Sequence, residues 1–406
     1  MGGVFLITIS GEDKPGVSVT LLELLAAHDA PVLDIGQAVI HETLSLGILT
    51  QVRDDTDLAR IERELSTCAR ELDLKIRFTA VAPQDYAHWV GGQGKDRHIV
   101  TLLGHVIDAR HLAGLTRVIF DQGLNIDVIT RLSGRIPLDG TPPPAMACVE
   151  FSVRGTPQDP TAMRAAFLAL AHDLGVDIAF QVDDVYRRNR RLVAFDMDST
   201  LISVEVIDEL AKAAGVGSQV AAITEAAMRG ELDFKESLRR RLALLKGLDE
   251  TKLAEIANRL PLTDGAERLV ATLKQLGYKI AILSGGFTWF GQKLQARLGI
   301  DYLYANELEI SGGRLTGGVV GEIVDAQKKA DLLAALAARE RINIAQVVAV
   351  GDGANDLPML AAAGLGIAFR AKPLVRESAR SALSTVGLDG ILYLLGVRDR
   401  EASGPI

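Results

Sequence analysis

Two aspartates stand one residue apart directly after a short apolar run: Asp196 and Asp198 follow "LVAF" at 192–195, and Ser199 and Thr200 come next. An apolar run without alternation is typical of a strand buried on both faces, where acidic residues have no packing role. Paired carboxylates suit nucleophilic attack combined with proton transfer, and they also suit binding of a hard cation. The sequence therefore indicates chemistry at the end of this strand.

Two further apolar runs end in polar motifs. Ser284-Gly285-Gly286 follows "KIAIL" at 279–283, and "GDGAND" at 351–356 follows "QVVAV". In an open α/β sheet the carboxyl ends of parallel strands line one crevice. We therefore expect the three motifs to converge, although each alone is also typical of a strand-to-helix loop with an Asp or Ser N-cap.

Convergence would bring four aspartates together: Asp196, Asp198, Asp352 and Asp356. Carboxylates at that density repel one another, so a divalent cation is their natural complement. A set of oxygen ligands suits Mg²⁺ better than zinc. The sequence thus predicts a magnesium site.

Composition narrows the chemistry further. All seven histidines and both cysteines lie before residue 190, so a zinc site, a thiolate nucleophile or a Ser-His-Asp triad built within 190–406 is excluded. Two cysteines fit a reducing cytoplasm. A net charge of -8 argues against a nucleic-acid partner, and no apolar run is long enough to span a bilayer. The N-terminal "GVFLITIS" resembles a strand more than a signal peptide. We expect a cytoplasmic protein without nucleic-acid or membrane partners.

The first 185 residues contain two copies of one βαββαβ unit, an α+β ferredoxin-like fold. The first copy, 1–82, has predicted strands at 4–10, 32–42, 45–52 and 74–80, with helices at 16–28 and 56–71. The second copy, 97–185, has predicted strands at 98–104, 125–133, 146–154 and 176–183, with helices at 110–121 and 160–174. An offset of 93 residues aligns Gly11 with Gly104 and Asp34 with Asp127. Residues 82–97 are predicted to be a linker, and 133–145 a long loop.

Residues 190–398 alternate short apolar strands with long helices, which predicts a Rossmann-like α/β domain with a mostly parallel sheet. "GIAF" at 366–369 is a further candidate strand. Between about 206 and 262 there is no strand signal, so this stretch is predicted to be a helical cap. A hairpin is expected around 304–324, turning at Gly312-Gly313.

These motifs resemble those of a known superfamily. "DMDST" is similar to the DxDx[TV] motif of the haloacid dehalogenase-like phosphohydrolases, and "SGG", a lysine near 329 and "GDGAND" resemble their other motifs. "GELDFKESLRRRLALLKGL" and "VAVGDGANDLPML", in this order, resemble the phosphoserine phosphatase family within it. The two N-terminal units resemble ACT domains, which bind amino acids in many biosynthetic enzymes.

The resemblance implies specific roles. Asp196 would form an aspartyl-phosphate, and Asp198 would act as general acid and base. Ser284 and the backbone N–H groups around Gly285 would hold a phosphate oxygen. Lys329 would supply a positive charge, with Lys328 as its rival. The implied Mg²⁺ ligands are Asp196, the carbonyl of Asp198, and Asp352, supported by Asn355 and Asp356.

Specificity would come from the cap. The resemblance implies that Glu205 takes the substrate ammonium and that Arg241 binds its carboxylate, for which the forked guanidinium is suited. Phe234 and Met228 would close over the substrate. The residues alone leave alternatives open: Arg241 could belong to a solvated helix face, Phe234 to the core, and Glu205 to a helix start that favours an acid.

The resemblance thus implies Mg²⁺-dependent hydrolysis of O-phospho-L-serine to L-serine and phosphate, the last step of serine biosynthesis. L-Serine is the expected effector, bound by the "GEDKPG" turn at Asp13 and Gly16 and near Gly104, although the second copy lacks the Pro-Gly pair. The ACT-like units would also make the enzyme a homodimer. Two alternatives stay open: phosphotransfer to an acceptor such as homoserine, and an amino-acid sensor whose second half is only a scaffold.

Overall fold

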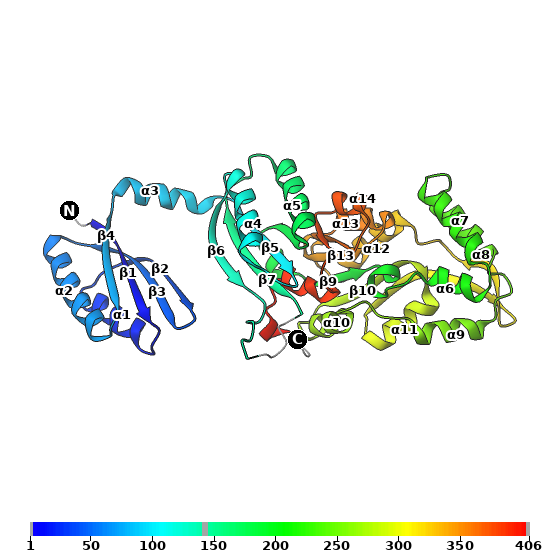
Figure 1. The fold of residues 1–406 in the computed structure, drawn as a ribbon, viewed down its shortest axis with the longest axis horizontal. Helices are drawn as coiled ribbons and strands as arrows, with labels where there is room; N and C mark the ends of the chain where they lie inside the picture. The colour runs from blue at the N-terminus through cyan, green and yellow to red at the C-terminus, as the bar shows by residue number, and fades with distance from the viewer. Residues whose placement is uncertain (1–2, 140–144, 403–406) are drawn as a thin grey trace. The chain divides into compact units, whose positions relative to one another are not determined.

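The computed structural model describes residues 3–139 and 145–402, and the chain divides into two compact units, Met1–Lys95 and Asp96–Ile406 (Figure 1). No helix among the described residues is both long and apolar enough to cross a membrane.

The first unit is a four-stranded antiparallel sheet in the order β2-β3-β1-β4. Along the chain its elements are β1 (Gly3–Glu12), α1 (Val17–Ala27), β2 (Val32–Ile40), β3 (Thr43–Val52), α2 (Asp55–Glu71) and β4 (Lys75–Val81). Alternate side chains such as Ile7 and Leu46 pack against Leu21 and Leu65 of the two helices. The predicted βαββαβ order is confirmed.

The predicted linker at 82–97 contains a helix, α3 (Pro83–Gly91). Pro83 occupies the first turn, where its fixed φ and missing N–H are tolerated. The rings of Tyr86 and Trp89, three residues apart on one face, lie 5.9 Å apart between centroids. The predicted linker therefore contains a helix, and the glycines of this stretch lie at and beyond the end of that helix.

The second unit begins with the same motif, in the equivalent strand order β6-β7-β5-β8. Its elements are β5 (Arg97–Gly104), α4 (Ala109–Asp121), β6 (Asn125–Arg131), β7 (Ala147–Arg154), α5 (Pro160–Leu174) and β8 (Asp177–Val182). The predicted repeat is confirmed. Within the predicted loop 133–145, residues 140–144 lie outside those described.

An α/β core follows. Its strands are β9 (Leu192–Phe195), β10 (Lys279–Phe287), β11 (Tyr302–Ser311), β12 (Arg314–Val320), β13 (Val347–Gly351), β14 (Leu365–Phe369) and β15 (Ser381–Leu383). The strands β11, β10, β9, β13, β14 and β15 are parallel neighbours in that order. β12 returns antiparallel to β11 through Gly312 and Gly313, both at positive φ, as the hairpin prediction required. The predicted fold class is confirmed.

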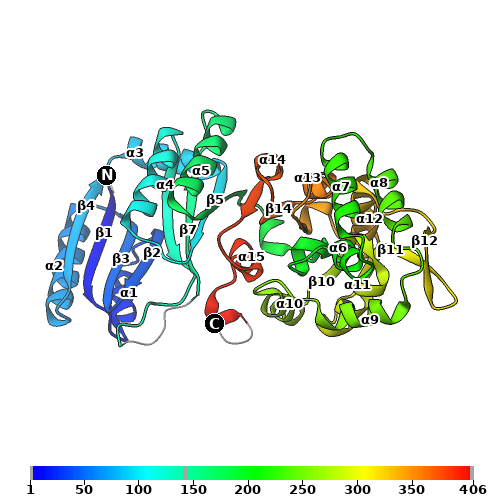
Figure 2. The same ribbon diagram turned by 45° about the vertical axis from the view of Figure 1, so that its right-hand side comes forward.

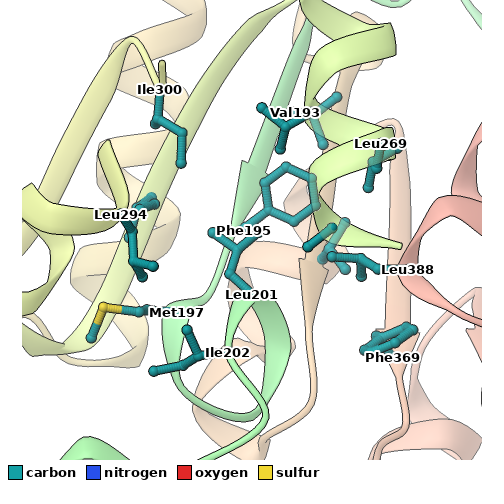
Figure 3. Close-up of a cluster of buried hydrophobic side chains, with 14 of the residues drawn as sticks. Val193, Phe195, Met197, Leu201, Ile202, Leu269, Leu294, Ile300, Phe369 and Leu388 are labelled. Atoms are coloured by element: carbon teal, nitrogen blue, oxygen red, sulfur yellow. The ribbon is translucent and has the colours of Figure 1, made fainter. Parts of the chain in front are cut away.

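Helices cover both faces of this sheet, which explains why its strands lack alternation. The core helices are α10 (Ala266–Gln275), α11 (Thr288–Leu298), α12 (Ala326–Arg339), α13 (Leu357–Ala362), α14 (Pro373–Ser378) and α15 (Ile391–Leu394). On β9, Val193 and Phe195 join one buried cluster with Leu269 and Leu294 of α10 and α11 (Figure 3). The intervening Leu192 and Ala194 join a second cluster, which includes residues of α12 and α13.

The cap consists of α6 (Val206–Ala213), α7 (Gly217–Met228), α8 (Phe234–Ala243) and α9 (Glu250–Arg259). No strand occurs between 206 and 262, all of which is described. The segments leading into and out of the cap pair through a bridge between Ile202 and Leu262. Figures 1 and 2 show these helices on the side of the core away from β5–β8.

The second βαββαβ unit and the core share one eleven-stranded sheet, which the sequence did not predict. β8 meets β15 antiparallel, with Ala179 opposite Ser381. The sheet face that such a unit leaves open is covered by the C-terminal segment: Cys148 shares a buried cluster with Tyr393, and Gln181 Nε2 donates to the Leu394 carbonyl at 3.0 Å. Local periodicity carries no information on this join, because it depends on two strands far apart in sequence.

Candidate active site

Strand register brings the three polar motifs together. Phe195, the last residue of β9, pairs with Ile282 on β10 and with Val350 on β13. The residues that follow on the three strands, Asp196, the Ser284 turn and the Gly351–Asp352 turn, therefore lie side by side at one edge of the sheet. The expected convergence is confirmed at the level of the backbone.

Asp196 is held from two sides. Its Oδ1 accepts the Met197 N–H at 2.7 Å, and its Oδ2 lies 2.9 Å from Lys329 Nζ. Lys329 is completely buried and also donates to Asp356 Oδ1 at 2.7 Å. Burial acts to lower the pKa of Lys329, but Asp196 and Asp356 outweigh it and the pKa rises. The adjacent Lys328 points away and pairs with Glu322 at 2.6 Å.

Three carboxylates form a cluster that could hold a cation. Ligand oxygens of Asp196, Asp352 and Asp356 all lie within 4.8 Å of one another. Burial, followed by the neighbouring carboxylates, raises the pKa of Asp352 to about 7. Burial and the charge of Asp196 also raise the pKa of Asp356 to about 6, although Lys329 opposes the shift. This repulsion and the oxygen-only donor set fit a hard divalent ion such as Mg²⁺.

Two contacts orient this cluster: the Thr200 hydroxyl lies 3.1 Å from Asp352 Oδ1, and the Gly353 N–H donates to Asp356 Oδ2 at 3.0 Å. Asp356 was expected only to support the metal, yet its carboxylate is part of the cluster. Asn355 Oδ1 lies against Gly353, where a Cβ would come within 2.2 Å of it.

Asp198 is placed by a tight turn. Ser199 adopts φ 55°, which is uncommon for a residue other than glycine, and the turn lets Asp198 Oδ1 accept the Val206 N–H at 2.9 Å. Burial, followed by the charges of Glu205 and Asp196, raises the pKa of Asp198 well above its ordinary value. A raised pKa favours the protonated form of this carboxyl, which is the form a general acid needs.

Sequence reasoning missed the role of Gly286. A Cβ there would lie 2.3 Å from Asp198 Oδ2, so only glycine permits this approach. Ser284 is buried, and its Oγ accepts the Gly286 N–H at 3.0 Å. The "SGG" motif contained the signal, because glycine often marks a position where another group approaches the backbone closely.

Asn306 on β11 was missed entirely. It is buried, its Nδ2 donates to the Gly285 carbonyl at 2.8 Å, and its Oδ1 accepts the Val324 N–H at 2.8 Å. It thereby ties the "SGG" turn to the segment that leads into α12, the helix that carries Lys329. No local signal in the sequence distinguishes this asparagine from a surface residue.

Two cap residues lie against the site. The Phe234 ring reaches Gly285, where a Cβ would lie 2.9 Å from its Cζ. Glu205 Oε1 accepts the Ser199 hydroxyl at 2.7 Å. The cap therefore contacts both the "SGG" turn and the loop that follows β9.

The three consecutive arginines of α8 are not equivalent. Arg241 is half-buried, whereas Arg239 and Arg240 are exposed. Burial lowers the pKa of Arg241, and the nearby carboxylates of Glu205, Asp208 and Asp198 oppose that shift.

Met228 differs from the other cap residues. It is 63% exposed, and its Sδ lies 3.5 Å from Lys372 Nζ. Its expected role in covering a substrate stays a prediction.

The expected regulatory residues lie at two kinds of turn. Gly16 has φ 97° and precedes α1 without any side-chain cap, and a Cβ there would meet nothing within 4 Å. Asp13, in the same turn, is exposed. At Gly104, by contrast, a Cβ would lie 3.1 Å from Val176 Cγ1. The first turn is open above the backbone, whereas the second is covered.

Comparisons with known proteins agree with this geometry. A haloacid dehalogenase-like hydrolase model matches residues 190–364, and ACT domain models match residues 4–79 and 96–181. A Streptomyces coelicolor protein named phosphoserine phosphatase is 43% identical over 98% of this chain and 93% of its own length. Phosphoserine phosphatase SerB2 of Mycobacterium tuberculosis is 41% identical over 98% of this chain and 94% of its own length.

Solved structures give the same result. A probable phosphoserine phosphatase from Vibrio cholerae, in an unliganded form, superposes with a TM-score of 0.58 at 37% identity. The match covers 73% of this chain and 86% of that one. With two relatives above 40% identity along nearly the whole sequence, the chain belongs to the phosphoserine phosphatase family of haloacid dehalogenase-like hydrolases, with two ACT domains ahead of its catalytic core.

Proposed function

We propose that this enzyme hydrolyses O-phospho-L-serine through an aspartyl-phosphate on Asp196, with Mg²⁺ as its cofactor. The observation that carries the proposal is the ion pair between Asp196 and the buried Lys329. A second carboxyl, Asp198, follows Asp196 two residues later. One carboxylate thus lies beside a fixed cation, while the other has a raised pKa. A nucleophile and an acid need this difference.

In the first step a carboxylate oxygen of Asp196 attacks phosphorus and the bond from phosphorus to the serine oxygen breaks. Asp198 donates its proton to the departing alkoxide, so L-serine leaves neutral at that oxygen. Lys329 and the Ser284 turn offset charge on the phosphoryl oxygens in this step. In the second step Asp198 takes a proton from water as the water oxygen attacks phosphorus, the acyl-phosphate bond breaks, and phosphate and Asp196 are released.

The proposed Mg²⁺ ligands are Asp196 and Asp352, with the Asp198 carbonyl, while Asn355 and Asp356 support the site. When bound, the ion neutralises charge on the phosphoryl group and on the carboxylates around it. Support comes from the cluster of Asp196, Asp352 and Asp356, whose oxygens lie within 4.8 Å of one another.

The cap residues support an amino-acid phosphate as substrate. A guanidinium at Arg241 and a carboxylate at Glu205 are opposite charges that could pair with the carboxylate and ammonium of phosphoserine. Phe234, lying against Gly285, would exclude water from the phosphate. The proposed site therefore recognises the phosphate of the substrate and also its amino-acid ammonium and carboxylate.

One experiment tests the reaction: phosphate release from a panel of phosphorylated amino acids and sugars, each with Mg²⁺ and with a chelator. We expect O-phospho-L-serine to be turned over fastest and the chelator to stop the reaction. Adding homoserine tests the alternative phosphotransferase activity. If O-phosphohomoserine appeared at the expense of free phosphate, the main activity would be phosphotransfer and not hydrolysis.

We also propose that L-serine regulates the enzyme at the ACT domains and that the enzyme is a homodimer. The open space above Gly16 supports a ligand at the first turn, where backbone N–H groups of α1 lack a side-chain cap. Edge strands β2 and β6 support pairing between copies, since Ile35, Val39, Val128 and Ile129 on them are exposed. A cytoplasmic location stays a prediction.

Variants with bulkier residues at Gly16 and Gly104 test regulation. The expected result is loss of serine inhibition in a protein that is still dimeric by size-exclusion chromatography. Unchanged inhibition would mean that serine acts only at the active site.

A further inference from the structure

A cavity with a mixed apolar and charged lining lies at the junction of the second ACT domain and the catalytic core. Its volume is about 360 Å³, and its walls come from α5 and β8 on one side and from α14 and β15 on the other. None of the residues that surround the carboxylate cluster lines it. It is also distinct from the turn at Gly16, which belongs to the other unit of the chain. The reaction proposed above makes no use of this cavity.

The lining carries both signs of charge and an apolar wall. Arg376 supplies a cation, and Asp177 and Glu377 supply carboxylates. Leu168 and Pro373 lie among the apolar residues of the wall. An amino acid presents a carboxylate, an ammonium and a side chain close together, which matches this lining. We propose that the cavity is an effector site for a free amino acid with an apolar side chain.

An occupant of the cavity would touch the residues that join the two domains. Asp177 is 4% exposed, and its two carboxylate oxygens accept the backbone N–H groups of Ser384 at 2.7 Å and Thr385 at 2.9 Å. Arg376 lies close enough for its charge to act on Asp177. Ser384 and Thr385 also line the cavity. A ligand that engages Arg376 or Asp177 therefore acts on the backbone segment that starts at Ser384.

That segment continues to the connection between core and cap. The Leu388 N–H donates to the Asp264 carbonyl at 2.7 Å. A Cβ at Gly265 would lie 2.1 Å from Asp389 Oδ1, so the segments around Gly265 and Asp389 are closely packed. Leu388 also shares the buried cluster of Figure 3 with Leu201.

The segment that leads from the cap back to the core ends immediately before Asp264. Leu262 bridges Ile202, and the Thr263 N–H donates to the Leu201 carbonyl at 3.0 Å. Residues 384–390 thus link the cavity to both cap connectors. Binding in the cavity changes the position or mobility of those connectors, and through them the closure of the cap over the active site.

Binding is tested by isothermal titration calorimetry of the full chain with L-leucine, and with L-serine for comparison. Ala169 lines the cavity on an exposed face of α5, so Ala169→Trp obstructs it without disturbing the core. Ala162, exposed two turns earlier on the same helix and not part of the lining, gives the control Ala162→Trp. We expect Ala169→Trp alone to abolish leucine binding.

A second pair of variants covers the case in which a tryptophan disturbs the fold. Removing the charge with Arg376→Gln is expected to weaken leucine binding about tenfold or more, since hydrogen bonds to charged groups contribute about 1.5–3 kcal/mol. Arg380→Gln, at an exposed position outside the lining, should leave it unchanged. No leucine binding by the wild type at millimolar concentration, or binding unaffected by both Ala169→Trp and Arg376→Gln, overturns the proposal.

Coupling is tested by hydrogen exchange with and without L-leucine. The expected result is altered exchange of amides at 384–390 and in the cap connectors 201–203 and 261–263. If L-leucine changed the exchange only of amides in α5 and α14, the cavity would bind the ligand without coupling to the cap. That result would overturn the role of the cavity as an effector site. Neither measurement depends on turnover, so failure of the proposed reaction and failure of this site can be told apart.

Discussion

Lys329 Nζ lies 2.9 Å from Asp196 Oδ2, and the lysine side chain is entirely buried. A buried cation of this kind cannot be removed without leaving its partner carboxylates uncompensated. The same pair therefore serves the stability of the core and the positioning of the proposed nucleophile. Lys329→Met is expected to stop turnover and to lower the free energy of unfolding by about 3–5 kcal/mol.

The neighbouring residue provides the control. Lys328 makes a surface ion pair with Glu322, so Lys328→Met should change the free energy of unfolding by less than about 1 kcal/mol and leave turnover intact. Urea unfolding and phosphate release are measured on both variants. Equal effects at the two positions would contradict the assignment of Lys329 to the site.

Asp196→Asn should abolish turnover of O-phospho-L-serine while leaving the fold intact, because an amide is nearly isosteric with a carboxylate but forms no acyl-phosphate. Asp198→Asn should slow turnover by roughly 10²- to 10⁴-fold through loss of proton transfer. The measurements are phosphate release and mass spectrometry of acid-quenched protein, which detects a phosphorylated Asp196 peptide. Wild-type turnover by Asp196→Asn would remove the covalent mechanism.

Arg241→Ala should lower kcat/KM for O-phospho-L-serine by roughly 10- to 100-fold, because the lost interaction is a charge-assisted hydrogen bond. An aryl phosphate such as p-nitrophenyl phosphate has no amino-acid carboxylate, so its hydrolysis should change little. Arg240→Ala is the matched control, since Arg240 is exposed and pairs with Glu236 on the helix surface. Equal losses on both substrates would show instead that Arg241 supports the cap or binds phosphate.

Gly286→Ala tests whether close approach to Asp198 matters. A Cβ at this position would lie 2.3 Å from Asp198 Oδ2, so we expect loss of turnover with a displaced acid. Gly217→Ala is the control: it begins α7, has no positive φ and has nothing within 4 Å of its Cβ position. Unfolding midpoints of both variants are compared with their kcat values. Full activity in Gly286→Ala would mean that Asp198 tolerates a different position.

Stability should depend on pH in a direction set by the carboxylate cluster. The pKa of Asp352 is raised to about 7, so the folded protein without metal binds a proton more tightly than the unfolded chain. Its free energy of unfolding should then be largest below the ordinary carboxyl pKa and fall as the pH rises towards 7. Mg²⁺ competes with those protons, so stabilisation by Mg²⁺ should grow over the same range.

Urea unfolding with Mg²⁺ and with chelator, at about pH 5 and about pH 8, checks this expectation. Asp352→Asn, which has no proton to lose at this position, should reduce the dependence, and the part that remains comes from Asp356 and Asp198, whose pKa values are also raised. A larger stabilisation by Mg²⁺ at the lower pH would contradict the proposed cation site.

The sequence by itself determined the elements and the motifs. The apolar runs that precede Asp196, Ser284 and Asp352 could be recognised as strands buried on both faces, because they lack the alternation of half-buried strands. That property can be read within a few residues. The repeated βαββαβ unit was readable for the same reason, since its periodicities are local. Strand ends that meet at one edge then followed from a general rule of parallel sheets.

Only the tertiary structure decided what depends on residues distant in sequence. It placed Lys329 inside the cluster and Lys328 outside, although the two are adjacent. It gave Asn306 its position between two turns, and it required glycine at Gly286 because Asp198 approaches from another strand. It also joined β8 to β15, and with them the ACT domain to the catalytic core. Each of these is a contact between separate segments, and a contact of that kind has no signature in the local pattern from which a sequence is read.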